Sequence, residues 1–576
     1  MHFRRYSALL FLALILSVGS IHAQTDQIQG GGKVGTEQQP TDEDLQQRKE
    51  LIRSIRENVG LFGEIYRQVS TRYVDQINPE GFLKAGIDGM LSTLDPYTEY
   101  IEPENTDDLR IMSMGHYGGV GMQIGTRGPD RILTVISPIE GTPAWRLGLR
   151  AGDQIIKIDD ESTEGFSSSE AAVRLRGPSG TDVKVTVRRQ GVQQPMEYTI
   201  TREDIEVKDV SYSGLIEPGI GYVRLTRFSR MAGDEVREAV EDMLQQGLEG
   251  LILDLRSNPG GLLPEALTVA ENFIEPGELI VTTRGREEGD VVEYRAQGKT
   301  SLPGNVPLVV LVNEGSASAS EIVAGAVQDL DRGIILGKTS FGKGLVQSVV
   351  NFNDGTALRV TTAKYYTPSG RLIQKVDYFS DNESILHEAD GAENDSLFTT
   401  SKGRQVLAHG GIKPDVEIDL PDVGELTIAL WQQDAFFDFA NKYVGSHPDL
   451  DNWKVTDAIL TDFQAYLKET DFEFESEMAV ELKTLHEHAE EAGYGDSFMQ
   501  ELADLETAVK VDDEAKFEEE KNDLKLRISI ELASVLTGSA GRTQAAIEQD
   551  IQVQEAVNLL KHGEKYAAAL DATSMN

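Results

Sequence analysis

Three closely spaced serines in the middle of the chain have the surroundings of a reacting group. The run 313–321 (NEGSASASE) carries them, directly after the continuous apolar run 307–312 (PLVVLV) and at the start of an expected helix. The apolar run predicts a buried strand. A serine at such a strand-to-helix turn lies beside unpaired backbone N–H groups and the positive end of the helix dipole, where an oxyanion is stabilised. Ser316, Ser318 and Ser320 are therefore candidate nucleophiles, although capping the helix is the commoner role of such a serine.

A serine nucleophile needs a base, and the histidines offer no obvious one. Those outside the first 23 residues and the far C-terminal region are His116, His387 and His409, and none stands beside an obvious acidic partner. Lys343 lies between two glycines in the run 337–347 (GKTSFGKGLVQ), whose tight turn is expected to place the lysine inward. To accept a proton the lysine must be neutral, so burial or a nearby cation has to lower its pKa.

The same run does not form a phosphate-binding loop. Lys338 and Thr339 follow Gly337, but Arg332 stands where that motif requires its first glycine. The glycines therefore indicate a tight turn.

The elements around these runs predict a mainly parallel sheet. A strand, a helix with one apolar side and a second buried strand follow one another, an order that predicts a right-handed crossover. Ligands in such sheets bind beyond the carboxyl ends of the strands, so the loop at Gly260 and Gly261 and the turn at Ser318 are expected at one edge. The expected strands are 220–225, 250–255, 307–312, 333–337 and 345–350, and the helix is 234–246.

A glycine-rich stretch earlier in the chain suggests a peptide-binding site. Gly118, Gly119, Val120 and Gly121 precede an apolar strand, in an expected strand region at 117–124. Successive exposed amides of this kind form a nest for a terminal carboxylate, and the adjoining strand offers an edge for an added peptide strand. A simple hairpin turn explains this stretch equally well on its own.

The residues that follow favour the peptide-binding interpretation. The order of GTPA at 141–144, LGL at 147–149 and AGDQII at 151–156 closely resembles a PDZ domain over about residues 110–200.

A second resemblance joins the serine run to the lysine run. GSASASE at 315–321, with GKG at 342–344 and TAKYYTPSG at 362–370, resembles the C-terminal processing (tail-specific) peptidases, which are Ser/Lys proteases with a PDZ domain. The resemblance covers about residues 50–420. In that family the nucleophile is the middle serine of the triplet and the lysine follows 25 positions later, as Lys343 follows Ser318 here. The resemblance therefore implies Ser318 as nucleophile and Lys343 as base.

The resemblance also implies supporting residues. Gln347 matches the glutamine that orients the lysine. Asp329 matches an acidic residue sometimes counted in the site, but eleven helical residues span about 16 Å, so we expect it to support the fold or the lysine loop. An oxyanion hole is implied at the backbone of Ala319 and of Gly261, or of Gly260. No metal ion, nucleotide or other cofactor is implied.

Composition and the start of the chain indicate where the protein acts. Residues 1–23 carry Arg4 and Arg5, then an apolar run, then small residues ending at Ala23, which is typical of a secretory signal peptide. We expect no stable membrane span once it is removed. The lack of cysteine excludes disulfides and thiol catalysis, and together with export it favours a bacterial periplasm. The formal charge of −42 argues against partners such as nucleic acid or an anionic membrane surface.

The length of 576 residues predicts several domains. We expect a multidomain α+β chain. Near its start, apolar residues at 51–73 recur every three or four positions and form one face of a helix, which must pack on the next domain or on a second copy. The expected parts are a signal peptide at 1–23, a linker at 24–45, an N-terminal helical domain at 46–110, a PDZ domain at 111–202, an α/β protease core with a mainly parallel sheet at 203–420, an acidic mobile insertion at 377–400 within it, and an acidic helical extension at 425–576.

The sequence thus predicts an exported serine endopeptidase whose PDZ domain receives a protein or peptide substrate by its apolar C-terminus. Ser318 and Lys343 then cleave a peptide bond near that end. One alternative is a non-catalytic PDZ scaffold on a protease fold. A second alternative is a protease that is inactive until a partner docks on the helical regions. Two further partners are kept as alternatives: a second copy of the chain, which would make a homo-oligomer, or an adaptor protein.

Overall fold

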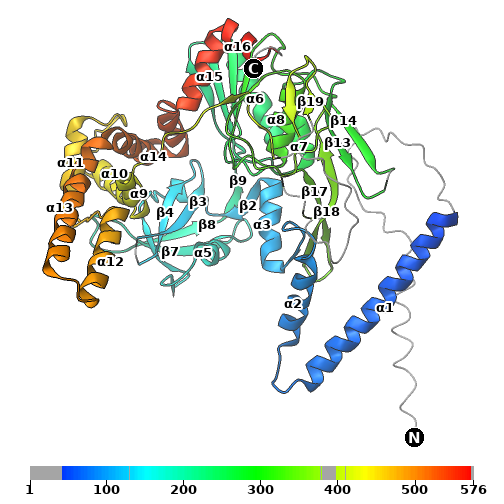
Figure 1. The fold of residues 1–576 in the computed structure, drawn as a ribbon, viewed down its shortest axis with the longest axis horizontal. Coiled ribbons are helices and arrows are strands. Elements are labelled where there is room, and N and C mark those ends of the chain that lie inside the picture. Colours follow the sequence, from blue (N-terminus) through cyan, green and yellow to red (C-terminus); the bar gives the residue numbers. More distant parts are fainter. Residues whose placement is uncertain are drawn as a thin grey trace.

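The computed structural model describes residues 42–571 except 129, 288, 376–377, 379–396 and 409. The predicted signal peptide, most of the linker and most of the acidic insertion lie outside the described residues, as do His387 and His409. The multidomain α+β architecture is confirmed, with helical regions at both ends of the chain and a mainly parallel sheet between them (Figure 1).

A six-stranded sheet forms the centre of the predicted protease core. Every neighbouring pair in it is parallel except β10 with β11. The central strands are buried along their whole length, which explains why their sequences are continuous apolar runs. In spatial order the strands are β10 (Val210–Glu217), β11 (Ile220–Leu225), β12 (Gly250–Asp254), β15 (Leu308–Val312), β16 (Ile334–Gly337) and β21 (Val416–Glu417).

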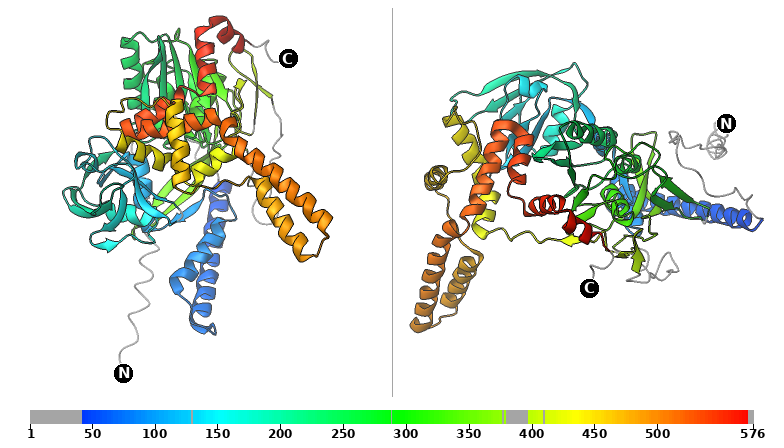
Figure 2. Two further views of the ribbon diagram at one scale, coloured as in Figure 1. Left: turned by 90° about the vertical axis from the view of Figure 1, so that its left-hand side faces the viewer. Right: turned by 90° about the horizontal axis from the view of Figure 1, so that it is seen from above.

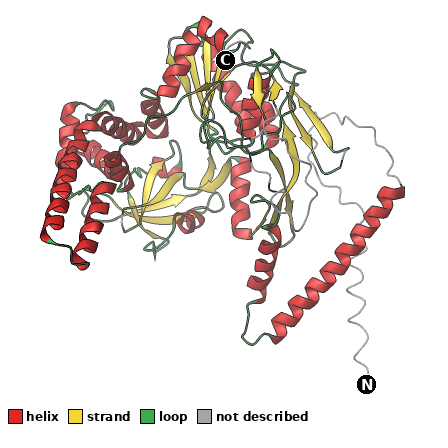
Figure 3. Cartoon of the chain, viewed as in Figure 1, coloured by secondary structure: helices red, strands yellow, loops and turns green. Residues whose placement is uncertain are grey.

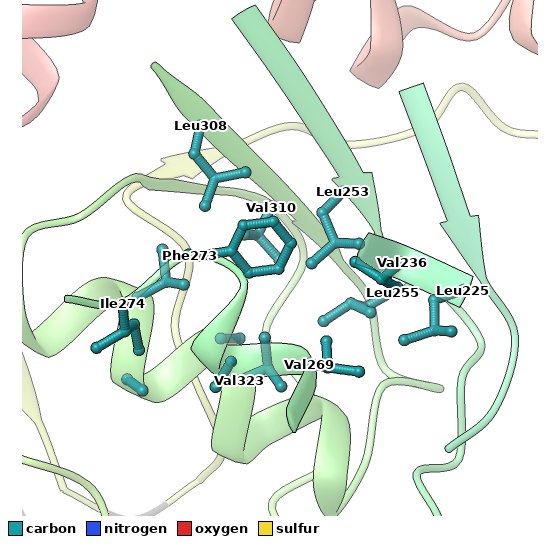
Figure 4. Close-up of a cluster of buried hydrophobic side chains, with 14 of the residues drawn as sticks. Leu225, Val236, Leu253, Leu255, Val269, Phe273, Ile274, Leu308, Val310 and Val323 are labelled. Atoms are coloured by element: carbon teal, nitrogen blue, oxygen red, sulfur yellow. The ribbon is translucent and has the colours of Figure 1, made fainter. Parts of the chain in front are cut away.

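Helices cover both faces of this sheet. Alternate residues of a strand point to opposite faces, so Leu253 and Val310 meet Phe273 on one side (Figure 4). Their neighbours Ile252 and Val309 pack against the C-terminal helices on the other side. The first face carries α6 (Ala232–Gln245), α7 (Leu263–Glu271) and α8 (Ala319–Asp329), and the second carries α15 (Ile551–Lys561) and α16 (Gly563–Ala569). The end of the expected C-terminal extension therefore completes the protease core (Figure 2).

A second, antiparallel sheet flanks the first and receives a strand from the N-terminal region. Its strands are β1 (Glu99–Ile101), β13 (Leu279–Arg284), β14 (Val291–Arg295), β17 (Leu345–Asn351) and β18 (Ala357–Tyr366). β1 pairs with β18, where Tyr100 lies opposite Leu358. Because β17 begins two residues after Lys343 and also pairs with β18, this pairing brings the turn before β1 close to Lys343.

The N-terminal helices leave much of their apolar surface open. They are α1 (Asp42–Arg72), α2 (Pro79–Leu91) and α3 (Pro103–Met114). Leu51, Ile55 and Val59 of α1 are 49%, 52% and 65% exposed. The sequence predicts that this face packs either on the next domain or on a second copy. Among the residues described, packing on the next domain is largely absent.

The predicted strand at 117–124 is wrong in one respect, because the chain divides it between two sheets. β2 (His116–Gly119) pairs with β9 (Glu203–Glu206), whereas β3 (Met122–Arg127) pairs with β4 (Ile132–Pro138). Gly121 lies between them with φ +76°, a backbone conformation that breaks a strand. The remaining elements of this region are α4 (Pro143–Arg146), β5 (Gln154–Ile158), β6 (Glu161–Ser162), α5 (Ser168–Leu175), β7 (Asp182–Arg188) and β8 (Met196–Thr201).

The C-terminal helices form a separate cluster around Phe436, Phe439 and Phe463 (Figure 3). This cluster also contacts the preceding region, because Asp434 pairs with Arg127 and accepts a hydrogen bond from Gly128 N at 3.1 Å. Its helices are α9 (Glu425–Gln432), α10 (Ala435–Ser446), α11 (Asp457–Glu469), α12 (Glu477–Glu491), α13 (Asp496–Glu519) and α14 (Lys521–Ile547). A short hairpin of β19 (Leu397–Thr399) and β20 (Gln405–Leu407) precedes them. Across residues 42–571 as described, no helix combines the length and apolarity that crossing a membrane requires.

The packing of α15 on the sheet generates a test. Ala556 is fully buried between this helix and the sheet, so Ala556→Asp places an unpaired carboxylate there, which is strongly unfavourable. We expect amide hydrogen exchange in α15 to accelerate on the order of 100-fold. The matched control is Gln554→Asp on the exposed side of the same helix, which should leave exchange unchanged. Equal exchange in the two variants contradicts the packing.

Candidate active site

The turn between β15 and α8 separates the three candidate serines. Ser316 and Ser320 are fully buried, and their hydroxyls donate to Leu255 O at 2.8 Å and to Asn258 O at 2.9 Å. Ser318 is only partly buried and has φ +54°, which few residues other than glycine adopt. The flanking serines therefore tie the turn to the loop after β12, and Ser318 is the serine that reaches the surface.

The glycine loop after β12 lies directly against Ser318. A Cβ atom on Gly260 would lie 2.9 Å from Ser318 Cβ and 2.8 Å from Ala319 N, so only glycine permits this approach. Gly260 also has φ +95°. Its N–H donates to Asn258 Oδ1 at 2.9 Å. Within the described part of the chain, the N–H groups of Ala319 and Gly261 have no hydrogen-bond partner. Of the two glycines, Gly261 is thus the one with an available donor beside the serine.

Lys343 lies in the loop between β16 and β17. Burial is the main cause that lowers the pKa of its ammonium group, and the nearby Arg359 lowers it further, whereas Asp95 and Glu321 oppose the shift. Nζ of Lys343 lies 4.2 Å from the centroid of the Tyr97 ring. Ser318 and Lys343 are both among the described residues, and Lys343 Nζ forms no hydrogen bond with Ser318 Oγ.

Glu321 connects the serine turn to the lysine loop. Its side chain is fully buried. One carboxylate oxygen accepts from Ser318 N at 2.8 Å and Lys343 N at 2.9 Å, and the other accepts from Ser340 Oγ at 2.6 Å and Gly342 N at 2.7 Å. Burial raises the pKa of this carboxyl to about 7, against the lowering effect of these four hydrogen bonds. Tyr365 adds a second link, because its Oη lies 3.2 Å from Ser318 O and also contacts Lys343 O.

The sequence analysis did not single out Glu321, although a signal was present. Serine followed three residues later by glutamate is the capping-box spacing, and here the glutamate reaches back to the backbone N–H of Ser318. The capping box accounts for one of the four hydrogen bonds. The other three come from a loop whose position the spacing does not encode.

Two predicted supporting residues lie apart from the reacting atoms. Asp329 ends α8, where it pairs with the buried Arg371 at 2.8 Å and accepts from Ser369 N at 3.0 Å. Gln347 on β17 donates to Thr361 Oγ1 at 3.3 Å, and not to Lys343. Asp329 therefore contacts the segment after β18, and the proposed contact of Gln347 with the lysine stays a prediction.

The predicted carboxylate nest is divided between two environments. Gly118 and Gly119 lie in β2, paired with Asp204 and Glu203 of β9. After them the chain leaves the strand. The carbonyls of Val120 and Gly121 accept from Ala144 N at 2.9 Å and Ile139 N at 3.0 Å. Their own N–H groups make no such bond among the described residues, so the available donors are at Val120 and Gly121.

The turn at residues 95–98 also reaches the site, a contact that the sequence analysis did not anticipate. Asp95 Oδ1 accepts from Tyr97 N at 2.8 Å and Thr98 N at 2.9 Å, which fixes the turn. Thr98 Oγ1 then accepts a hydrogen bond from Thr361 N at 3.2 Å. The hydroxyl of Thr361 is the group that accepts the hydrogen bond of Gln347. The turn thus covers the lysine loop, and no local pattern indicates a contact over so long a separation.

Comparison with protein families identifies four segments of the chain. Peptidase family S41 matches residues 219–381, and a PDZ domain model matches residues 134–189. The model described as the N-terminal domain of the activating protease CtpB matches residues 14–105. The model described as the C-terminal helical domain of a probable PDZ-protease matches residues 426–560.

Individual relatives point the same way. The carboxy-terminal-processing protease of Bartonella bacilliformis is 42% identical over 319 residues, which are 55% of this chain and 72% of that relative. The carboxyl-terminal-processing protease of a Picosynechococcus species is 37% identical over 358 residues, 58% of this chain and 85% of the relative. A solved photosystem II D1 C-terminal processing protease has 30% identity and a TM-score of 0.32, covering 63% of this chain and 93% of that one.

The four hydrogen bonds to Glu321 generate the second prediction. In Glu321→Gln the amide NH₂ must face at least one backbone N–H, either that of Gly342 or those of Ser318 and Lys343, and each unsatisfied donor costs about 1–3 kcal/mol. We expect the loop at 340–344 to loosen, so that the amides of Gly342 and Lys343 exchange at least about 10-fold faster. Glu314→Gln, at an exposed glutamate in the same turn, is the matched control. Unchanged exchange in Glu321→Gln shows that the carboxylate does not hold the loop.

Proposed function

Because the chain belongs to the carboxyl-terminal-processing proteases, PDZ-containing serine proteases of peptidase family S41, we propose that it cleaves substrates near their C-termini with a Ser318–Lys343 dyad. One observation carries this assignment: the backbone of Ser318 and that of the half-buried Lys343 share one buried oxygen of Glu321, and the Gly260–Gly261 loop packs directly on the serine. The serine, the donors and the lysine are the three parts that acyl transfer by a Ser/Lys pair requires.

The reaction proceeds by proton transfer through the lysine. Ser318 Oγ attacks the scissile carbonyl carbon while neutral Lys343 Nζ takes its proton. The N–H groups of Ala319 and Gly261 stabilise the oxyanion of the tetrahedral intermediate. When the C–N bond breaks, Lys343 returns the proton to the leaving amine. A water molecule then gives a proton to Lys343 and attacks the acyl carbon. As the ester bond to Ser318 Oγ breaks, Lys343 returns that proton to Oγ, which releases the new carboxylate and restores the free serine.

The electrostatics of the site support this use of a lysine. A base must be unprotonated, and burial together with Arg359 moves the pKa of Lys343 in the required direction. Since the neutral form is present above the pKa, the cleavage rate should rise as the pH rises through it. The lack of a Ser318–Lys343 hydrogen bond fits a site without substrate, because such bonds often tighten only when substrate binds.

The PDZ domain is the proposed receptor for the substrate tail. The N–H groups of Val120 and Gly121 are the available donors for a terminal carboxylate, and β3 begins immediately after them as the strand to which a peptide adds. The proposed substrates are exported proteins with apolar C-termini, because residues 1–23 have the pattern of a secretory signal and the protein would then act in the periplasm.

A regulated form of this function is the second candidate. The exposed apolar side chains of α1 are typical of a surface that a partner covers, so a protease that is idle until a second copy or an adaptor docks there fits the same chain. Full activity of the isolated monomer would contradict this candidate.

Substitution of the dyad tests the catalytic assignment. Ser318→Ala and Lys343→Ala should each reduce cleavage of an unfolded protein with an apolar tail on the order of 10⁴-fold, because the nucleophile or its base is lost. Lys338→Ala is the matched control, since Lys338 lies in the same loop but pairs with the exposed Asp419. Undiminished turnover in either dyad variant contradicts the assignment.

Amidation of the substrate tests tail recognition. A C-terminal amide lacks the charge that the N–H groups of Val120 and Gly121 would bind, so the PDZ domain should bind an amidated tail about 10- to 100-fold more weakly than the free acid. Fluorescence anisotropy of the two labelled peptides with the Ser318→Ala protein measures this difference without cleavage. Equal affinity places the recognition of the substrate elsewhere.

A further inference from the structure

The ring of Tyr97 forms a cation–π contact with the proposed catalytic lysine. Lys343 Nζ lies 4.2 Å from the ring centroid, well inside the range over which an ammonium is attracted to an aromatic face. Tyr97 is half-buried, and burial raises the pKa of its hydroxyl, so the ring stays neutral. The attraction is therefore that of a neutral aromatic ring for a cation, and a neutral amine does not share it.

The position of the ring is fixed by the turn that carries it. Asp95 is buried and accepts hydrogen bonds from Tyr97 N and Thr98 N. The carbonyl of Tyr97 accepts from Arg359 Nε at 3.2 Å, although the two residues are 262 positions apart. Thr98 in turn bonds to Thr361 of β18. The ring is thus part of the protease sheet and not a loose surface group.

Four groups of defined charge or polarity surround the ammonium. Arg359 of β18 repels it, whereas Asp95 of the turn and Glu321 of α8 attract it. The fourth group is the Tyr97 ring, whose centroid lies 4.2 Å from Nζ. Within the part of the chain that the structure describes, neither carboxylate forms an ion pair with Nζ, and both already accept hydrogen bonds from the backbone of the turn and of the lysine loop. The direct contact of the cation is therefore with the ring.

We propose that Tyr97 is a positioning residue that holds protonated Lys343 away from Ser318 and releases it when the lysine loses its proton. The protonated ammonium gains from the ring, so it stays there. The neutral amine gains nothing from the ring and instead accepts the hydrogen bond of the Ser318 hydroxyl. The position of the base is thereby coupled to its protonation, and the proposal rests on the catalytic assignment of Ser318 and Lys343.

The first test measures the protonation of Lys343 without turnover. In the Ser318→Ala background, the rate at which an acylating reagent modifies Lys343 is followed by mass spectrometry as a function of pH. Tyr97→Leu keeps the site apolar but removes the ring, so the pKa of Lys343 should fall by about 0.4 to 1.5 pH units. Tyr97→Phe keeps the ring and should leave the pKa unchanged. A Tyr97→Leu pKa that is unchanged or higher, or an equal fall in Tyr97→Phe, overturns the proposal.

The second test uses the active enzyme. The acid limb of the pH dependence of kcat/KM should move to lower pH by the same amount in Tyr97→Leu and should not move in Tyr97→Phe. Tyr466→Leu is the matched control, since it removes a lysine–tyrosine contact (Lys442 Nζ at 5.4 Å) far from the site. If Lys343→Ala still cleaves substrate, the catalytic assignment itself fails. If Lys343 is required but the limb stays in place in Tyr97→Leu, only the role of Tyr97 fails.

Discussion

Glu321 is removed from water completely, and a carboxylate in that position is retained only when hydrogen bonds replace its hydration. Three backbone N–H groups and one hydroxyl replace it, and they come from the two loops that carry Ser318 and Lys343. Neither loop can shift without leaving a donor or the carboxylate unpaired. The relative position of the two loops that carry Ser318 and Lys343 is therefore fixed by the buried carboxylate of a third residue, Glu321.

The parallel sheet places these loops within reach of one another. β12, β15 and β16 run side by side, so the glycine loop, the serine turn and the lysine loop all leave the same edge. The C-terminal helices help to hold this edge, because Asp550 pairs at 2.7 Å with Arg256, which lies just before the glycine loop. Arg256 is held at the same time by the fully buried Asp254. The helical extension thus helps to position the Gly260–Gly261 loop as well as covering the sheet.

Sequence patterns predicted the parts of the site that depend on local or near-local order. The apolar runs gave the central strands, since strands buried on both faces need apolar residues throughout. The motif spacing related Ser318 to Lys343 only through a family resemblance. The choice between Gly260 and Gly261 depends on a side chain, Asn258, that occupies one of the two N–H groups. The contact of Tyr97 with Lys343 depends on the pairing of β1 with β18, and strand pairing across such a separation leaves no periodic signal.

Each accessory region of the chain is connected to a different part of the site. The N-terminal turn contacts Lys343 through Tyr97, and α15 contacts the residue before the oxyanion loop through Asp550. The segment after the PDZ domain holds Ser229 through a 2.5 Å hydrogen bond to Asp209. Ser229 follows Phe228, whose N–H donates to Gly260 O at 3.1 Å and whose carbonyl accepts from Leu262 N at 2.9 Å, on either side of Gly261. The Lys343 loop and the Gly260–Gly261 loop are therefore each supported by a different accessory region, in addition to the link through Glu321. In the proposed mechanism, a change in any one of these accessory regions therefore acts on a different component of the site.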